Sequence, residues 1–163
     1  MKIKVLPSMK PIQNVMKVMF CILFFNSYAQ EVTFQNLDSL QKEEARYTII
    51  FLKTDWCKYC HMMEEQTLSD SAVNQFLNEK FYFISFDAES KDDIEFLGET
   101  FSYIPNGDRT GIHQLAKELA TVDGKVTYPT LVFLDKDFSI MYQHVGVVET
   151  GELLEVLRKL LKN

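Results

Sequence analysis

The sequence has 163 residues and holds 17 Lys and Arg against 23 Asp and Glu, so its formal net charge is −6. The first 29 residues contain four of the lysines and no acid, which leaves 13 basic residues and a net charge of about −10 in the remainder. A chain of this length fits one domain, and so acidic a surface argues against nucleic acid and anionic lipid as partners.

Residues 1–29 are predicted to be a cleavable secretory signal peptide. Lysines precede the apolar run VMFCILFF (18–25), and NSYA (26–29) ends in small residues. This order is typical of an export signal, and the run is shorter than the about 20 residues that span a membrane. An uncleaved anchor is the alternative. Cleavage after Ala29 would leave residues 30–163 as one domain in the periplasm or outside the cell.

The first part of that domain is predicted to alternate helices with strands. YTIIFL (47–52) is a continuous, largely apolar run, which is typical of a buried central strand. A cap at Ser69 or Asp70 is expected to start a helix. The expected elements are a helix over 36–46, a strand over 47–52, a helix over 57–68, the capped helix after it, and a strand over 81–88.

The second part begins with an insertion over about 94–111. IEFLGETFSYI is expected to form a hairpin around Gly98, followed by the turn-rich PNGDRTG. We expect it to pack against the domain, with shaping of a partner groove as the alternative. A helix over 112–120, an antiparallel pair of strands over 130–134 and 139–147, and a helix over 150–163 are expected next. Strands alternating with helices predict an α/β fold around a mixed sheet.

The motif CKYCH fits three chemistries. Cys57 and Cys60 are the cysteines left after the expected cleavage, because Cys21 lies in the signal peptide. C-x-x-C is a dithiol redox motif, C-x-x-C-H attaches c-type haem with His61 as axial ligand, and two cysteines with a histidine can bind zinc. A structural zinc site needs four ligands, and nothing singles out His113 or His144 to complete either metal site. We therefore favour dithiol chemistry, with no metal and no cofactor.

The position of the motif assigns roles to its cysteines. Cys57 follows a buried strand and starts a helix, where unpaired N–H groups and the helix dipole favour thiolate over thiol. Lys58 and a protonated His61 add positive charge beside it. Cys60 lies nearly one turn later, within reach of a disulfide. We expect Cys57 to attack a substrate disulfide and Cys60 to resolve the mixed disulfide.

DWCKYC after an apolar strand, with YPT (128–130) entering a later strand, resembles the thioredoxin family. The likeness is greatest to exported thioredoxin-like proteins and to the thioredoxin-fold domain of the periplasmic thiol:disulfide interchange transporter. It implies a mixed sheet with helices on both faces and a cis bond before Pro129. It also implies protein thiols or disulfides as partners of a monomer, with a membrane thiol-electron transporter as donor. The substrate-binding residues would be Trp56, Lys58, Tyr59, Tyr128 and Pro129.

Glu64 matches an acid that these relatives carry seven residues after the first cysteine. It would take the proton of Cys60, or else be an ordinary solvated glutamate. Phe51 stands where thioredoxins have a buried aspartate, and Lys58-Tyr59 replaces Gly-Pro. Because those two residues tune the redox poise, the direction of electron flow stays open. A disulfide reductase is our expectation, with an oxidase or isomerase, a haem carrier and a redox-inactive binding module as alternatives.

Overall fold

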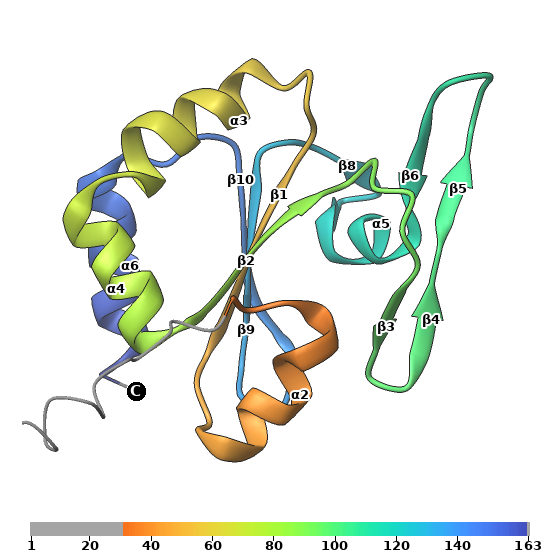
Figure 1. The fold of residues 1–163 in the computed structure, drawn as a ribbon. Coiled ribbons are helices and arrows are strands. Elements are labelled where there is room, and N and C mark those ends of the chain that lie inside the picture. The colour runs from red at the N-terminus through yellow and green to blue at the C-terminus, as the bar shows by residue number, and fades with distance from the viewer. Residues whose placement is uncertain (1–30, 163) are drawn as a thin grey trace, which may run out of the picture. The chain divides into compact units, whose positions relative to one another are not determined.

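A four-stranded mixed sheet forms the centre of the fold, which the computed structural model describes for residues 31–162 (Figure 1). The strand order is β10-β9-β1-β2. β1 (Thr48–Lys53) runs parallel to β2 (Tyr82–Asp87) and antiparallel to β9 (Thr130–Leu134), and β9 pairs antiparallel with β10 (Ile140–Val145). The predicted α/β fold with a mixed sheet is confirmed. The expected signal peptide lies outside the described residues.

Helices cover both faces of this sheet (Figure 1). One face carries α4 (Ser71–Lys80), α6 (Thr150–Leu160) and α3 (Lys58–Met63), which continues into the π-helix η1 (Glu64–Leu68). The other face carries α2 (Phe34–Glu43) and α5 (Gln114–Ala120). Because β1 and β9 are buried on both faces, their sequences are continuous apolar runs rather than alternating ones.

Caps decide where several helices begin. The Asp70 side chain accepts hydrogen bonds from the N–H groups of Ala72 and Val73, so Asp70 is the cap expected before α4. Thr33 caps α2 in a capping box with Asn36. The expected start at residue 36 was therefore two residues late, and the helix ends at Glu43 rather than at residue 46.

The expected insertion consists of two hairpins. β3 (Ile94–Phe96) pairs with β4 (Glu99–Phe101), and β5 (Tyr103–Pro105) pairs with β6 (Gly111–His113). Leu97 and Gly98 form the first turn with φ values of 54° and 80°, a backbone that glycine adopts without strain. The hairpin around Gly98 is thus confirmed, and its buried residues join the core beside α2.

The short strands β6, β7 and β8 were not expected. β6 takes up residues 111–113, so the helix expected over 112–120 begins at Gln114. β7 (Thr121–Val122) and β8 (Lys125–Val126) follow it as a minimal hairpin. Asp123 and Gly124 form its turn, both with positive φ, which is the pairing that two-residue hairpins favour.

Candidate redox site at the start of α3

A disulfide joins Cys57 and Cys60, whose Cα atoms lie 5.2 Å apart. Cys57 is the N-cap of α3, and its Sγ accepts a hydrogen bond of 3.1 Å from the Cys60 N–H. Cys57 is 5% exposed, whereas Cys60 is fully buried. The more accessible cysteine is therefore the one at the helix start, where backbone N–H groups and the helix dipole favour negative charge.

The inner side of the disulfide is apolar. Both cysteines belong to the core cluster that α3, α4 and α6 form with the sheet, together with Phe51, Met63 and Leu131. Phe51 is fully buried, so a phenyl ring occupies the place where the resemblance would put an aspartate. A hydrocarbon side chain cannot accept a proton, so any proton acceptor for Cys60 has to lie elsewhere.

An aromatic pair forms one wall of the site. The rings of Trp56 and Tyr128 meet edge to face with centroids 6.3 Å apart. This contact brings the Tyr128–Pro129 peptide against the residue before Cys57, and that peptide is cis, as the resemblance implies. The Pro129 carbonyl accepts a hydrogen bond from the Gly146 N–H at 2.8 Å, which links the segment to the end of β10.

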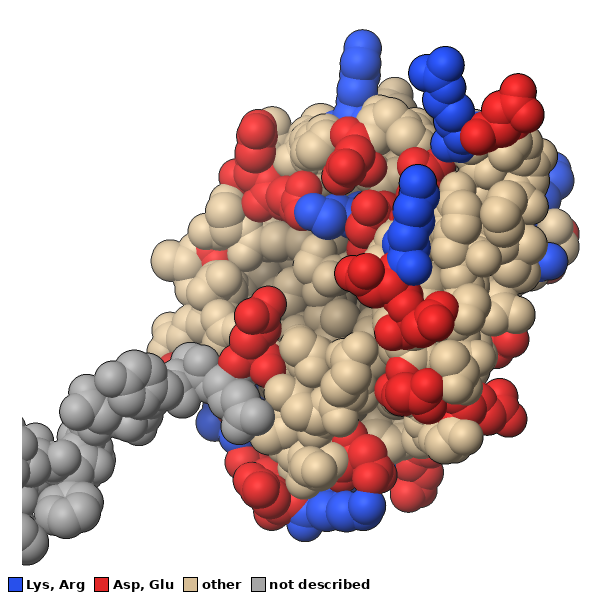
Figure 2. All heavy atoms as spheres, turned by 45° about the vertical axis from the view of Figure 1, so that its right-hand side comes forward, with Lys and Arg blue, Asp and Glu red and all other residues tan. Residues whose placement is uncertain are grey.

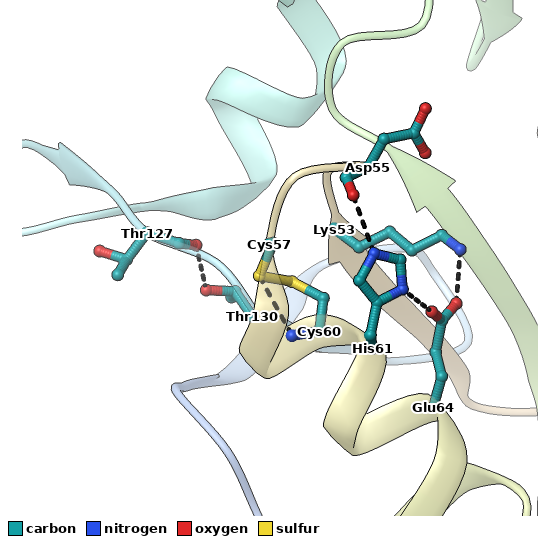
Figure 3. The surroundings of a disulfide bond; sticks show 8 residues. All are labelled: Lys53, Asp55, Cys57, Cys60, His61, Glu64, Thr127 and Thr130. Atoms are coloured by element: carbon teal, nitrogen blue, oxygen red, sulfur yellow. Dashed lines mark hydrogen bonds and ion pairs between the residues drawn. A yellow bond between two sulfur atoms is a disulfide. The ribbon is translucent and has the colours of Figure 1, made fainter.

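Tyr128 is an uncharged member of this wall. Burial raises the pKa of its phenol to about 12, and the negative charges of Glu89 and Asp87 add to the effect. The phenol is therefore neutral at physiological pH and available as a hydrogen-bond donor. Next to it, the Thr130 hydroxyl donates to the Thr127 carbonyl at 2.8 Å across the cis peptide (Figure 3).

Charged groups lie on another side of the disulfide (Figure 3). Lys53, the last residue of β1, donates through Nζ to Oε1 of Glu64. Oε2 of Glu64 lies 3.5 Å from Nδ1 of His61, and Nε2 of His61 lies 2.8 Å from the Asp55 carbonyl oxygen. The structure thus joins Glu64 and His61 to each other, and it adds Lys53 and the Asp55 carbonyl to them.

The other expected site residues beside the cysteines are exposed. Trp56 and Tyr59 are each 66% exposed, and Lys58 is exposed between the cysteines. Lys53 is the residue that the sequence analysis missed. The sequence feature that could have pointed to Lys53 is its position as the only charged residue of an apolar strand, at the end of that strand and four residues before Cys57.

The histidines outside the motif bear on the metal alternatives. His113 is buried; its Nδ1 accepts from the Leu115 N–H at 3.2 Å, and its Nε2 lies 3.1 Å from the Asp92 carbonyl oxygen. Both ring nitrogens of His113 therefore have backbone partners. Over residues 31–162, no three or more His, Cys, Asp or Glu side chains are grouped so as to hold a metal ion. That same part of the chain contains no helix both long and apolar enough to cross a membrane.

Comparison with solved structures finds the same fold. A thioredoxin from Thermus thermophilus matches with a TM-score of 0.55 and 20% identity, over 80% of this chain and 85% of the other. The DsbH oxidoreductase matches with a TM-score of 0.55 and 18% identity, over 99% of this chain and 95% of the other. The C-terminal domain of Neisseria meningitidis DsbD in its reduced form matches with a TM-score of 0.50 and 18% identity, over 77% and 90%.

Curated relatives match a shorter part of the sequence. Spermatogenesis-associated protein 20 of Mus musculus is 30% identical over 66 residues, which are 39% of this chain and 8% of that protein. The protein of the same name from Rattus norvegicus matches equally. This chain therefore spans only a small part of the curated relatives it matches. By contrast, the family model of the thioredoxin-like domain matches residues 33–161. The chain belongs to the thioredoxin-like domain family.

Proposed function

We propose that this protein is an exported thiol–disulfide oxidoreductase that works as a disulfide reductase. The observation that carries the proposal is the Cys57–Cys60 disulfide, with Cys57 as the N-cap of α3 beside the aromatic pair of Trp56 and Tyr128. Membership in the thioredoxin-like family supports thiol–disulfide exchange. The periplasmic or extracellular location rests on the signal-like residues 1–29 alone.

The reaction uses two electrons and two successive exchanges. In the reduced protein, the Cys57 thiolate attacks one sulfur of a substrate disulfide, forms a mixed disulfide and expels the other substrate sulfur as a thiolate, which takes a proton from solvent. Cys60 then loses its proton and attacks the Cys57 sulfur. The second substrate thiol leaves, and the Cys57–Cys60 disulfide remains. A dithiol donor, for which we propose a membrane thiol-electron transporter, reduces this disulfide again.

The remaining site residues have roles in this scheme. Trp56, Tyr128 and Pro129 would hold an extended substrate segment, and Lys58 and Tyr59 would contact it from α3. Glu64 or His61 would accept the proton of Cys60, because Phe51 leaves no acceptor beneath the disulfide. Burial of Cys60 fits a resolving role, since it is reached by Cys57 within the chain and not by substrate.

The reduction potential of the Cys57–Cys60 pair tests the direction of electron flow. Equilibration of the protein with glutathione or dithiothreitol buffers would give the potential. A value near about −270 mV is expected for a reductase, whereas a value near about −120 mV would make the protein an oxidant. A Cys60→Ser variant is expected to accumulate mixed disulfides through Cys57. A variant that trapped no disulfide-bearing protein would contradict the assignment of Cys57 as the attacking thiol.

A further inference from the structure

Four residues form a polar brace across the turn that carries Cys57. We define the brace as Lys53, Asp55, His61 and Glu64. Lys53 and Asp55 lie on the strand side of this turn, and His61 and Glu64 lie on the helix side. Their contacts run from the Lys53 ammonium to the Glu64 carboxylate, from there to the His61 ring, and back to the Asp55 carbonyl oxygen. The brace therefore ties α3 to the segment that positions Trp56 and Cys57 (Figure 3).

The brace contains one full positive and one full negative charge close to the disulfide. His61 directly follows Cys60, and Glu64 lies one turn further along the helix. The Lys53 and Glu64 side chains are only 26% and 31% exposed, so solvent screens them less than surface charges. The other Lys or Arg ion pairs that the structure records within residues 31–162 lie on α2, directly after it, and on α6.

We propose that Lys53 is a positioning residue that holds the Glu64 carboxylate in the brace, and that these two opposite charges together set the acidity and redox poise of the Cys57–Cys60 dithiol. The inference rests on the proposed thiol–disulfide exchange. It deepens that function by assigning the electrostatic control of the dithiol to a pair formed by the end of β1 and the start of η1.

The two charges act on the dithiol with opposite signs. A cation stabilises a thiolate and a carboxylate destabilises it. Without Lys53, the uncompensated Glu64 charge raises the pKa of the dithiol and disfavours the reduced form. Without the Glu64 charge, the uncompensated Lys53 lowers that pKa and favours the reduced form, which makes the protein a stronger oxidant. A brace that served only as a structural link would be weakened by either change in the same way.

Other charged or titratable groups face the dithiol and stay constant in this comparison. Lys58 and His61 lie on α3 beside the cysteines. Tyr128 faces them from the aromatic wall, with Asp87 and Glu89 near its phenol. These residues are retained in every variant below, so a difference in sign between two variants reports the charges of the Lys53–Glu64 pair, including the contact of Glu64 with His61.

The test compares Lys53→Met, Glu64→Gln and the double variant in the full mature chain. Two quantities are measured on the reduced or equilibrated protein: the thiolate absorbance as a function of pH, and the equilibrium constant with glutathione. Lys53→Met is expected to raise the first pKa of the dithiol and to shift the equilibrium toward disulfide by about threefold to tenfold. Glu64→Gln is expected to lower the first pKa of the dithiol and to shift the equilibrium with glutathione toward the reduced form by a similar factor. The double variant should return to within about twofold of wild type.

Matched controls carry the same charge changes at a distance from the site. Lys42 and Asp38 form an exposed pair on α2, so Lys42→Met and Asp38→Asn should leave both quantities within about twofold of wild type. Lys53→Arg keeps the charge and should also stay close to wild type. The proposal is overturned if Lys53→Met and Glu64→Gln shift the equilibrium in the same direction, or by no more than the α2 variants do.

The test remains decisive if one variant fails to fold. It also remains decisive if the protein is not a reductase. Should Lys53→Met be too unstable to measure, Glu64→Gln decides, because the proposal requires it to lower the pKa and favour the reduced form. Glutathione replaces a protein substrate throughout. A wild-type potential in the oxidant range would overturn the reductase assignment, whereas the opposite signs of the two variants would still hold.

Discussion

The two faces of the central sheet are built alike but differ in what their cores contain. The face beneath α2 and α5 buries hydrocarbon side chains and aromatic rings: Phe34 packs edge to face on Phe86 and Phe96 at 5.2 and 5.4 Å. The face beneath α3, α4 and α6 buries a disulfide among its hydrophobic residues. We call them the packing face and the redox face.

The difference shows how a reactive group is placed in an ordinary core. On the redox face, apolar residues surround the two sulfurs at the end of the sheet, and the charged groups of the brace lie at the rim beside them. On the side of the molecule turned toward the hairpins, acidic side chains are more numerous than basic ones among the charged groups (Figure 2). Changes at the disulfide and its rim should therefore alter chemistry, and changes in the core of the packing face should alter stability.

The largest effect is expected from Cys57→Ser. Because Cys57 is the thiol that we propose attacks the substrate, the rate of disulfide reduction should fall by roughly a thousandfold or more, measured with a protein disulfide substrate. The free energy of unfolding should change little, because a disulfide across two residues constrains the unfolded chain only slightly. A variant with undiminished biological activity would favour the redox-inactive binding module.

The matching change on the packing face is Phe34→Ala. Loss of a buried ring that contacts two others should lower the free energy of unfolding by about 3–5 kcal/mol, measured by denaturant titration. The reduction potential of the folded protein should stay at its wild-type value. A shifted potential in folded Phe34→Ala protein would mean that the two faces are coupled through the sheet.

The sequence predicted the sheet better than the ends of the elements. TLVFL matches β9 residue for residue, because a strand buried on both faces has an unbroken apolar run. Helix starts depend on single side-chain contacts, such as the Thr33 cap that moves the start of α2 to Phe34. The strands β7 and β8 have two residues each, which is too few to show the alternation of apolar and polar residues that predicts a strand. Only the Asp123-Gly124 pair indicates their turn.

The site divides in the same way. Cys57 and Cys60 stand in one short motif, and Pro129 was found through the family resemblance, so the sequence predicted this part. Lys53 and Glu64 lie 11 residues apart on different elements. Their contact depends on how α3 packs beside the end of β1, and no local sequence pattern predicts that packing.

A smaller effect is expected at the cap of α4. Asp70→Ala removes the acceptor for two backbone N–H groups and should lower the free energy of unfolding by about 1 kcal/mol. Because α4 belongs to the redox face but its cap lies away from the cysteines in the chain, the reduction potential should not change. Asp70→Asn, which can still cap, is the matched control and should recover most of the stability.

The smallest effect is confined to alkaline pH and concerns Tyr128. Its folded-state pKa of about 12 lies above the ordinary value of 10, so between these values the folded state binds the proton more tightly than the unfolded state does. Stability from this group is complete below pH 10 and is lost as pH rises toward 12. Tyr128→Phe cannot ionise, so its free energy of unfolding should fall less steeply over this range than that of wild type.

Denaturant titrations at a series of pH values would measure the two slopes, with Tyr142→Phe as control because the Tyr142 side chain is half exposed on β10. Equal slopes for wild type and Tyr128→Phe would show that the phenol is solvated as in the unfolded chain. The aromatic wall would then be more open to water than the contact between Trp56 and Tyr128 indicates. On the redox face, water would be excluded only from the inner side of the disulfide.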